Sequence, residues 1–144
     1  MKRKIFRIID ANLNRSREGL RVCEEITRLA LNNEALTKEL KSVRHRISAI
    51  AREFEDKLGR MSGSRESRAD VGRSSRIKGG MARKSLGDVF AANMERAKES
   101  LRVLEEFFQL IDPPASAKFS KIRFKVYDIE KRAIQKIEPL CNRR

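Results

Sequence analysis

Two stretches of this chain repeat each other and decide its fold. They read ANLNRSREGLRVCEE at residues 11–25 and ANMERAKESLRVLEE at residues 92–106, which lie 81 positions apart. One asparagine, two arginines and three glutamates recur in register together with the apolar residues. Helix packing alone repeats apolar positions and lets polar ones vary. The recurring polar residues therefore indicate a constraint beyond packing.

A weaker echo follows each copy of the repeat. It reads VRHRI at residues 43–47 and IRFKV at residues 122–126, with an offset of 79. The repeating unit is therefore a pair of segments. Such a duplication is typical of two supersecondary units that bury their apolar faces against each other.

Four segments show helical periodicity, at about residues 6–31, 34–58, 88–110 and 116–137. The second has apolar residues at alternating spacings of four and three, which predicts a seam for a partner helix, with Gly59 as its C-terminal cap. Asn32-Asn33 ends the first helix, Pro113-Pro114 follows the third, and Pro139 follows the fourth. No segment alternates as a strand does.

These segments predict one all-α domain over residues 1–144. A hairpin at about 6–58, a loop at 59–87 rich in Gly, Ser and Arg, and a second hairpin at about 88–138 would form a four-helix bundle with pseudo-two-fold symmetry. In an up-down arrangement, the first and third helices would start at the same end, beside the loop.

Composition narrows the function classes. The net charge of +14 attracts anions, which include phosphorylated metabolites and nucleic acid. There is no apolar run near 18 residues and no secretory signal, so we expect a cytoplasmic protein without a membrane span. Cys23 and Cys141 lack metal-ligand spacing, and Cys23 lies on an apolar stripe, where a buried thiol is expected.

The loop carries eight basic and two acidic residues between Arg60 and Leu86. It lacks the spacing of a P-loop. In the element Arg68-Ala69-Asp70-Val71-Gly72 the aspartate can hold a turn that the glycine completes, and Asp70 could hold a magnesium ion. A connection of this length is either functional or disordered, and the sequence leaves both open.

A helical wheel of the repeat places Asn12 and Arg15 on the arc of core residues, and Asn93 and Arg96 on the equivalent arc. We therefore expect both arginines to point inward, where each must meet an anion. One interpretation is internal ion pairs with glutamates at the edge of the same face, namely Glu18, Glu99, Glu25 and Glu106. The other is a polar phosphate-binding pocket.

Arg44 and Arg123 form a second duplicated pair. Folding each hairpin back on itself brings Arg44 close to the height of Arg21 and Glu25, which predicts an interhelical salt bridge. His45 has no counterpart in the second copy and is expected to be solvated.

Residues 9–25, the LKSVRH stretch at 40–45, Asp70-Val71-Gly72 and the second copy at 93–106 together resemble the helical domain found ahead of the barrel in some bacterial thiamine-phosphate synthases. In these fusions the barrel joins hydroxymethylpyrimidine diphosphate to thiazole phosphate. Without a barrel, this chain is not expected to perform the synthase reaction itself.

The resemblance implies a thiamine-biosynthesis accessory protein that binds a phosphorylated pyrimidine precursor, with a hydroxymethylpyrimidine-phosphate kinase step that uses Mg and ATP. It implies that Arg15, Arg96 and Arg68, with Gly72, hold phosphates and that Asn12 and Asn93 orient the substrate. Glu18 or Asp70 would be the metal ligand or base.

Other classes remain open from the sequence. A basic helical nucleic-acid binder would explain the charge, although stacking aromatics are few and no helix-turn-helix spacing is evident. A protein-interaction module could dock onto a separate thiamine-phosphate synthase barrel or form a homodimer.

Overall fold

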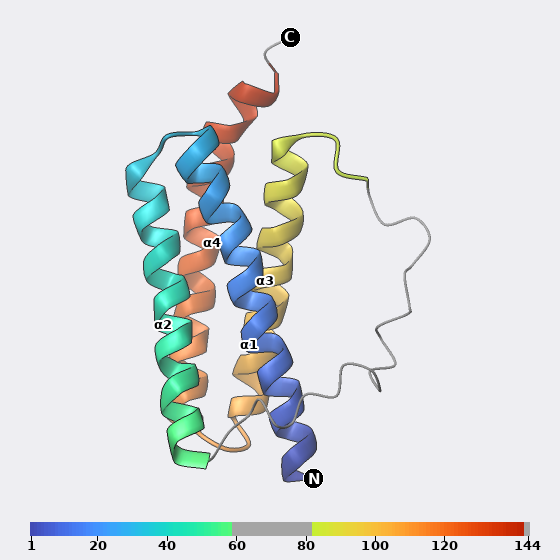
Figure 1. The fold of residues 1–144 in the computed structure, drawn as a ribbon, viewed down its shortest axis with the longest axis vertical. Coiled ribbons are helices and arrows are strands. Elements are labelled where there is room, and N and C mark those ends of the chain that lie inside the picture. Colours follow the sequence, from blue (N-terminus) through green and yellow to red (C-terminus); the bar gives the residue numbers. More distant parts are fainter. Residues whose placement is uncertain (59–81, 143–144) are drawn as a thin grey trace.

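The computed structural model describes residues 1–58 and 82–142, and the side chains of 57 and 58 are outside this description. Four long helices make up the described part: α1 (Lys2–Glu25), α2 (Glu34–Leu58), α3 (Leu86–Phe108) and α4 (Pro113–Cys141) (Figure 1). A π-helical turn, η1 (Ile26–Ala30), extends α1. The prediction of an all-α bundle is confirmed.

Each half of the chain forms an antiparallel hairpin: α1, η1 and α2 make hairpin 1, and α3 and α4 make hairpin 2 (Figure 1). The hairpins meet chiefly where α1 packs against α3, with a second contact between α2 and α4. All neighbouring helices in the bundle are therefore antiparallel, as Figure 1 shows.

The relative direction of α1 and α3 corrects the sequence prediction. Phe54 near the end of α2 contacts Phe108 at the end of α3, with ring centroids 5.2 Å apart. The Cys23 thiol near the end of α1 donates to the Phe90 carbonyl near the start of α3, at 3.6 Å. The starts of α1 and α3 thus lie at opposite ends of the bundle, so the prediction that they share one end is wrong.

The core follows the predicted apolar faces. The α2 seam of Leu36, Leu40, Val43, Ile47, Ile50 and Phe54 is buried, as are Ile9, Leu13, Leu20 and Cys23 of α1. At the end where α1 starts, a chain of aromatic contacts links all four helices, with Phe6, Phe54, Phe108 and Phe119 in sequence. These edge and tilted contacts add to the free energy gained by burial.

Prolines mark one helix boundary differently from the prediction. Pro113 and Pro114 occupy the first positions of α4, where a missing N–H costs nothing, and the Asp112 side chain caps this helix by accepting from Ala115 N at 3.2 Å. Pro139 lies inside α4, so the prediction that the helix ends before it is wrong. It is exposed and sits in the last turn. The predicted cap at Gly59 lies outside the described residues.

Backbone hydrogen bonds and a side-chain cap shape the turn between η1 and α2. The Leu31 N–H donates to the Ile26 carbonyl at 3.0 Å, and Asn32 adopts a φ of 50°, the left-handed conformation that asparagine tolerates. Asn33 then caps α2 because its Oδ1 accepts from Leu36 N at 3.0 Å.

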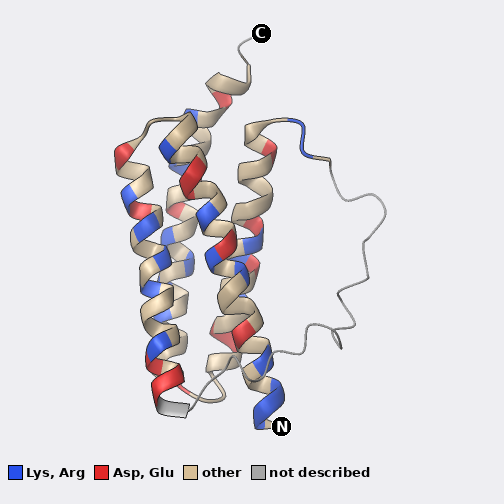
Figure 2. Cartoon of the chain, viewed as in Figure 1, with Lys and Arg blue, Asp and Glu red and all other residues tan. Residues whose placement is uncertain are grey.

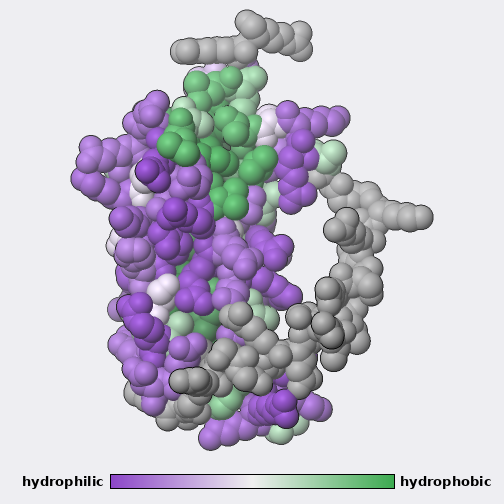
Figure 3. All heavy atoms as spheres, in the orientation of Figure 1, coloured by the Kyte–Doolittle hydropathy of each residue, from purple (hydrophilic) through white to green (hydrophobic). Residues whose placement is uncertain are grey.

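Most of the face shown in Figure 3 is hydrophilic. Apolar side chains gather at the end where α4 finishes, and the exposed leucines there are Leu29, Leu86 and Leu140. Within the described ranges, no helix combines the length and the hydropathy needed to cross a bilayer.

Candidate anion-binding site

The second half of the repeat holds each hairpin together. Glu24 of α1 accepts from Arg44 Nε of α2 at 2.9 Å, and Glu105 of α3 accepts from Arg123 Nε of α4 at 2.8 Å. Glu24 is buried. The predicted interhelical salt bridge is confirmed, with Glu24 rather than Glu25 as the main partner of Arg44.

The neighbouring repeated residues support this pair from the same helix. Arg21 contacts Glu24 and Glu25, both at 3.4 Å, and the equivalent Arg102 contacts Glu105 at 3.3 Å and Glu106 at 2.5 Å. One arginine and two glutamates of the repeat, in both copies, therefore have a structural role.

The charge state of the hairpin 2 pair follows from its surroundings. Burial opposes the charged form of Glu105, but the hydrogen bond and positive charge of Arg123 outweigh it and lower the pKa of Glu105 below its ordinary value. The Arg123 pKa is raised, mainly by its hydrogen bond to the same carboxylate. The pair is thus ionised at neutral pH.

The repeated asparagines bond to their own helices. Asn12 Nδ2 donates to the Ile8 carbonyl and Asn93 Nδ2 to the Val89 carbonyl, both at 2.8 Å. Asn12 is buried and Asn93 is half-buried. Each amide fixes its own orientation by this bond, and its Oδ1 keeps the capacity to accept from a ligand.

Arg15 and Arg96 do not point into the core, and the prediction of inward arginines is wrong. Both side chains are exposed. The buried residues of α1 run around the helix from Ile26 through Ser16 to Glu24, so the buried arc is centred near Ser16. Arg15 lies about 100° around the helix from Ser16, just outside the edge of this arc. At the contact with α3, an added Cβ on Gly19 would lie 2.8 Å from the Asn93 carbonyl oxygen.

Both arginines lie on one face of the bundle. On α1, the side chains of Glu24 and Arg17 face α2, bonding to Arg44 and Ser48. Arg15 lies about 160–180° around the helix from these two residues, on the far side of the contact with α3. The same spacing applies to Arg96 and Glu105 on α3. We call this face, with Asn12, Arg15, Glu18, Asn93, Arg96 and Glu99, the outer seam.

Acidic and basic residues interleave on the outer seam. Figure 2 shows acidic and basic bands close together midway along α1 and α3. Since Gly19 faces the backbone between Asn93 and Ala97, Arg15 and Glu99 lie at about the same height, as do Arg96 and Glu18, for a rise of about 1.5 Å per residue. Each arginine of one hairpin thus lies level with a glutamate of the other.

These four charged residues have no described role in the fold. Glu18 and Glu99 are exposed like the two arginines, and within residues 1–58 and 82–142 no ion pair within 4.0 Å involves any of the four. Their recurrence in both copies is therefore the part of the repeat that hairpin pairing leaves unexplained.

The predicted loop residues Arg68, Asp70 and Gly72 lie outside the described residues, so their place relative to the outer seam stays a prediction. In the described part, no group of three or more His, Cys, Asp or Glu could hold a metal ion. A divalent cation at the outer seam would need oxygens from a ligand as well.

Sequence reasoning missed Lys98, which is buried beside hairpin 2's ion pair. Its Nζ donates to Glu130 at 2.8 Å, also contacts Glu95, and lies 4.8 Å from the Tyr127 ring centroid. Burial opposes its charge, but the two carboxylates outweigh burial and raise the pKa of Lys98. Arg17 is its counterpart in hairpin 1, so a basic residue at this place in both copies was the available signal.

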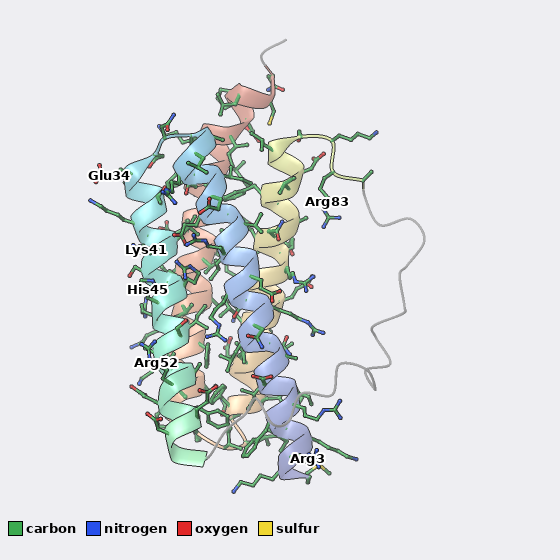
Figure 4. The ribbon with its side chains drawn as sticks, in the orientation of Figure 1. Arg3, Glu34, Lys41, His45, Arg52 and Arg83 are labelled. Carbon is green, nitrogen blue, oxygen red and sulfur yellow. The ribbon has the colours of Figure 1, made fainter. Side chains whose placement is uncertain are left out.

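Two other predictions concern single residues. Burial raises the pKa of the Cys23 thiol to about 12, which agrees with the predicted buried thiol. His45 is exposed on α2, as predicted (Figure 4).

Comparison with known proteins identifies the family. The profile of the ThiD2 family matches residues 7–132. A thiamine-phosphate synthase of Synechococcus sp. is 38% identical over 127 residues, covering 88% of this chain and 34% of the relative. Those of Synechocystis sp. and Rhodopirellula baltica are 40% and 37% identical, covering 88% and 87% of this chain and 35% and 33% of the relatives.

The chain thus spans about a third of the length of the curated relatives it matches. No solved structure matches it. The family and these relatives associate the chain with thiamine biosynthesis. The chain belongs to the ThiD2 family.

Proposed function

We propose that this protein binds hydroxymethylpyrimidine phosphate at the outer seam and phosphorylates it with Mg-ATP. The observation that carries the proposal is the division of the repeat. One glutamate of each copy, Glu24 or Glu105, pairs across its hairpin, and one arginine and a second glutamate contact it or each other within the same helix. Arg15, Arg96, Glu18 and Glu99 are also present in both copies but lie exposed, without an ion pair among the described residues.

The residue types fit phosphate chemistry. A guanidinium donates two parallel hydrogen bonds to a phosphate and stays charged at all relevant pH values. Magnesium in kinases is usually held by one or two carboxylates together with phosphate oxygens, a role that suits Glu18 or Glu99. Asn12 and Asn93, fixed by bonds to their own helices, can orient a substrate through Oδ1.

The charge of the whole chain supports the same class of ligand. A net charge of +14 raises the local concentration of anionic metabolites near the surface. The product would be hydroxymethylpyrimidine diphosphate, which the barrel of thiamine-phosphate synthases joins to thiazole phosphate. A thiamine-phosphate synthase is therefore the partner that we propose to consume it.

Isothermal titration with hydroxymethylpyrimidine phosphate, with and without Mg-ATP, tests the binding step. The double variant Arg15→Met and Arg96→Met should weaken binding by about tenfold or more, because a charge-assisted contact to the phosphate contributes about 1.5–3 kcal/mol. Methionine keeps a long side chain and a comparable helix propensity. Unchanged affinity in the double variant would contradict the proposal.

Arg52→Met is the matched control. Arg52 is exposed on α2 and projects away from α1 and α3 (Figure 4). The Arg52→Met variant removes the same charge from another face of the bundle. Its affinity for hydroxymethylpyrimidine phosphate should therefore stay within about threefold of the wild-type value. Circular dichroism should show equal helicity in all variants.

The kinase step has its own assay. Formation of the diphosphate from the monophosphate and Mg-ATP, followed by phosphorus NMR, should occur with the wild type and be lost in Glu18→Gln. Saturable binding with no diphosphate formed would leave a binding protein without the catalytic step.

A further inference from the structure

We propose that the outer seam has two separate phosphate positions, with Arg15 at one and Arg96 at the other, and that each binds a different ligand. This inference rests on the proposed function. The two ligands would be the pyrimidine monophosphate that accepts the phosphoryl group and the nucleoside triphosphate that donates it.

The first step is the symmetry of the crossing. Gly19 faces the backbone between Asn93 and Ala97, and the repeat relates each residue of α1 to the residue 81 positions later in α3. For antiparallel helices these two facts place a pseudo-two-fold axis close to Ser16 and Ala97. Both are fully buried. The outer seam therefore presents the same groups once on each side of this axis.

The second step is the direction of the arginines. Arg15 lies four residues from Gly19 toward the N-terminal end of α1. For a rise of about 1.5 Å per residue, the backbones of Arg15 and Arg96 are then about 4–5 Å apart along the bundle axis. Helical side chains lean toward the N-terminus of their own helix. Since α1 and α3 are antiparallel, the two guanidinium groups lean away from each other, which suits two phosphates better than one shared phosphate.

The third step concerns the glutamates. By the same rule Glu18 leans toward the N-terminal end of α1 and Glu99 toward that of α3, so both approach the height of the axis. Each lies about 60° further around its helix from the α1–α3 contact than the arginine of the same copy, and Glu99 also lines a groove between α3 and α4. A divalent cation held between two bound phosphates would therefore take one of these carboxylates as a further ligand, and the phosphates would supply the oxygens that the described residues lack.

Such an arrangement fits phosphoryl transfer. An oxygen of the acceptor monophosphate forms a bond to the γ-phosphorus while the bond from this phosphorus to the β–γ bridging oxygen breaks, which releases the nucleoside diphosphate. The attacking and leaving oxygens must lie roughly in line on opposite sides of the phosphorus. With one anion position on each side of the pseudo-two-fold axis, the acceptor oxygen can approach the γ-phosphorus from the side opposite to the leaving oxygen.

The two positions are not identical. Asn93, one helical turn from Arg96, is half-buried, whereas its counterpart Asn12, one turn from Arg15, is buried. The amide on the Arg96 side is therefore the more accessible of the two. This difference allows the two sides to select different ligands.

Single variants test the inference. Affinities of Arg15→Met and Arg96→Met are measured by titration for hydroxymethylpyrimidine phosphate and, separately, for the Mg complex of β,γ-imido ATP. We expect each variant to lower the affinity for one ligand by about tenfold or more, and the affinity for the other ligand by less than about threefold. Lysine at the same position should recover part of the lost affinity, and Arg52→Met should change neither.

If both variants lower the affinities for both ligands equally, the assignment of two separate phosphate positions is wrong, whereas the proposed function still stands. Equilibrium dialysis with inorganic phosphate separates the two failures. If the pyrimidine does not bind but two phosphates bind per chain, and one is lost in each single variant, then the proposed function fails and the two positions stand. One phosphate or none in the wild type would overturn the two positions.

Discussion

Hairpin 1 and hairpin 2 contain the same ion pair at the same place, yet their surroundings differ. Glu24 with Arg44 and Glu105 with Arg123 are equivalent. Beside the pair, hairpin 1 has the Arg17–Ser48 contact, whereas hairpin 2 has the buried Lys98 over the Tyr127 ring. The comparison separates residues that every copy of the hairpin needs from residues that only one copy uses.

The largest expected effect is loss of the shared ion pair. Glu24→Gln leaves Arg44 without its carboxylate partner. The Glu24 side chain is 5% exposed, whereas that of Glu105 is 13% exposed. We expect Glu24→Gln to lower the free energy of unfolding by about 3 kcal/mol and Glu105→Gln by about 2 kcal/mol, because the Gln amide placed against the arginine has less access to water at the more buried position 24. Urea denaturation measures both. Equal losses, or a larger loss in hairpin 2, would show that burial does not rank the two pairs.

The next effect tests the asymmetry at the crossing. In Gly19→Ala the new Cβ meets a backbone carbonyl, which cannot move without shifting α3. The variant should lose about 2 kcal/mol despite alanine's better helix propensity. Ser100→Ala, the equivalent site, adds no atoms and should change stability by less than about 1 kcal/mol. Thermal unfolding that ranks the pair in the opposite order would contradict the close crossing.

A smaller effect concerns the contact between the hairpins. Glu39 of α2 accepts from Arg132 at 2.6 Å and from Lys125 at 2.9 Å, both on α4. The hydrogen bond from Arg132, with smaller contributions from Lys125, lowers the pKa of Glu39 to about 2.

Because this pKa is below the unfolded value, the stabilisation is present above about pH 4.5 and is lost as pH falls toward 2. Glu39→Gln should cost about 1 kcal/mol at pH 7, and this difference from the wild type should vanish near pH 2. Urea titrations at several pH values measure the difference. A difference that persists at the lowest pH would exclude this carboxylate as its source.

The smallest effect is at a position where the hairpins differ on the surface. His45 and its counterpart Phe124 are both exposed. His45→Ala should leave the free energy of unfolding within about 0.5 kcal/mol, and the affinity for hydroxymethylpyrimidine phosphate unchanged. A loss of affinity in calorimetry would move part of the site onto α2.

Periodicity predicted the fold well because burial repeats along a helix. The α2 seam is buried as predicted, and the Arg44 and Arg123 pairs follow from folding each hairpin on itself. The helical wheel alone could not give the centre of the buried arc, which lies near Ser16, so that Arg15 falls just beyond the edge of the arc. This is why Arg15 and Arg96 were expected inside and lie outside.

The direction of α3 relative to α1 also could not follow from the repeat, since a duplicated hairpin packs equally well by symmetry in more than one way. The signal available was the length of the connection. Residues 59–85 can extend by up to about 3.3 Å each, more than enough to pass along α2, which is about 37 Å long. A short connection would have required α3 to start where α2 ends.

The pseudo-two-fold crossing at Ser16 and Ala97 has a consequence for how such a chain can arise. A half-length protein consisting of one hairpin would form the same crossing as a homodimer, with two identical halves of the outer seam. Joining two copies in one chain keeps the dimer's geometry and removes its dependence on concentration. It also lets each half change alone, as Gly19 against Ser100 and Arg17 against Lys98 show.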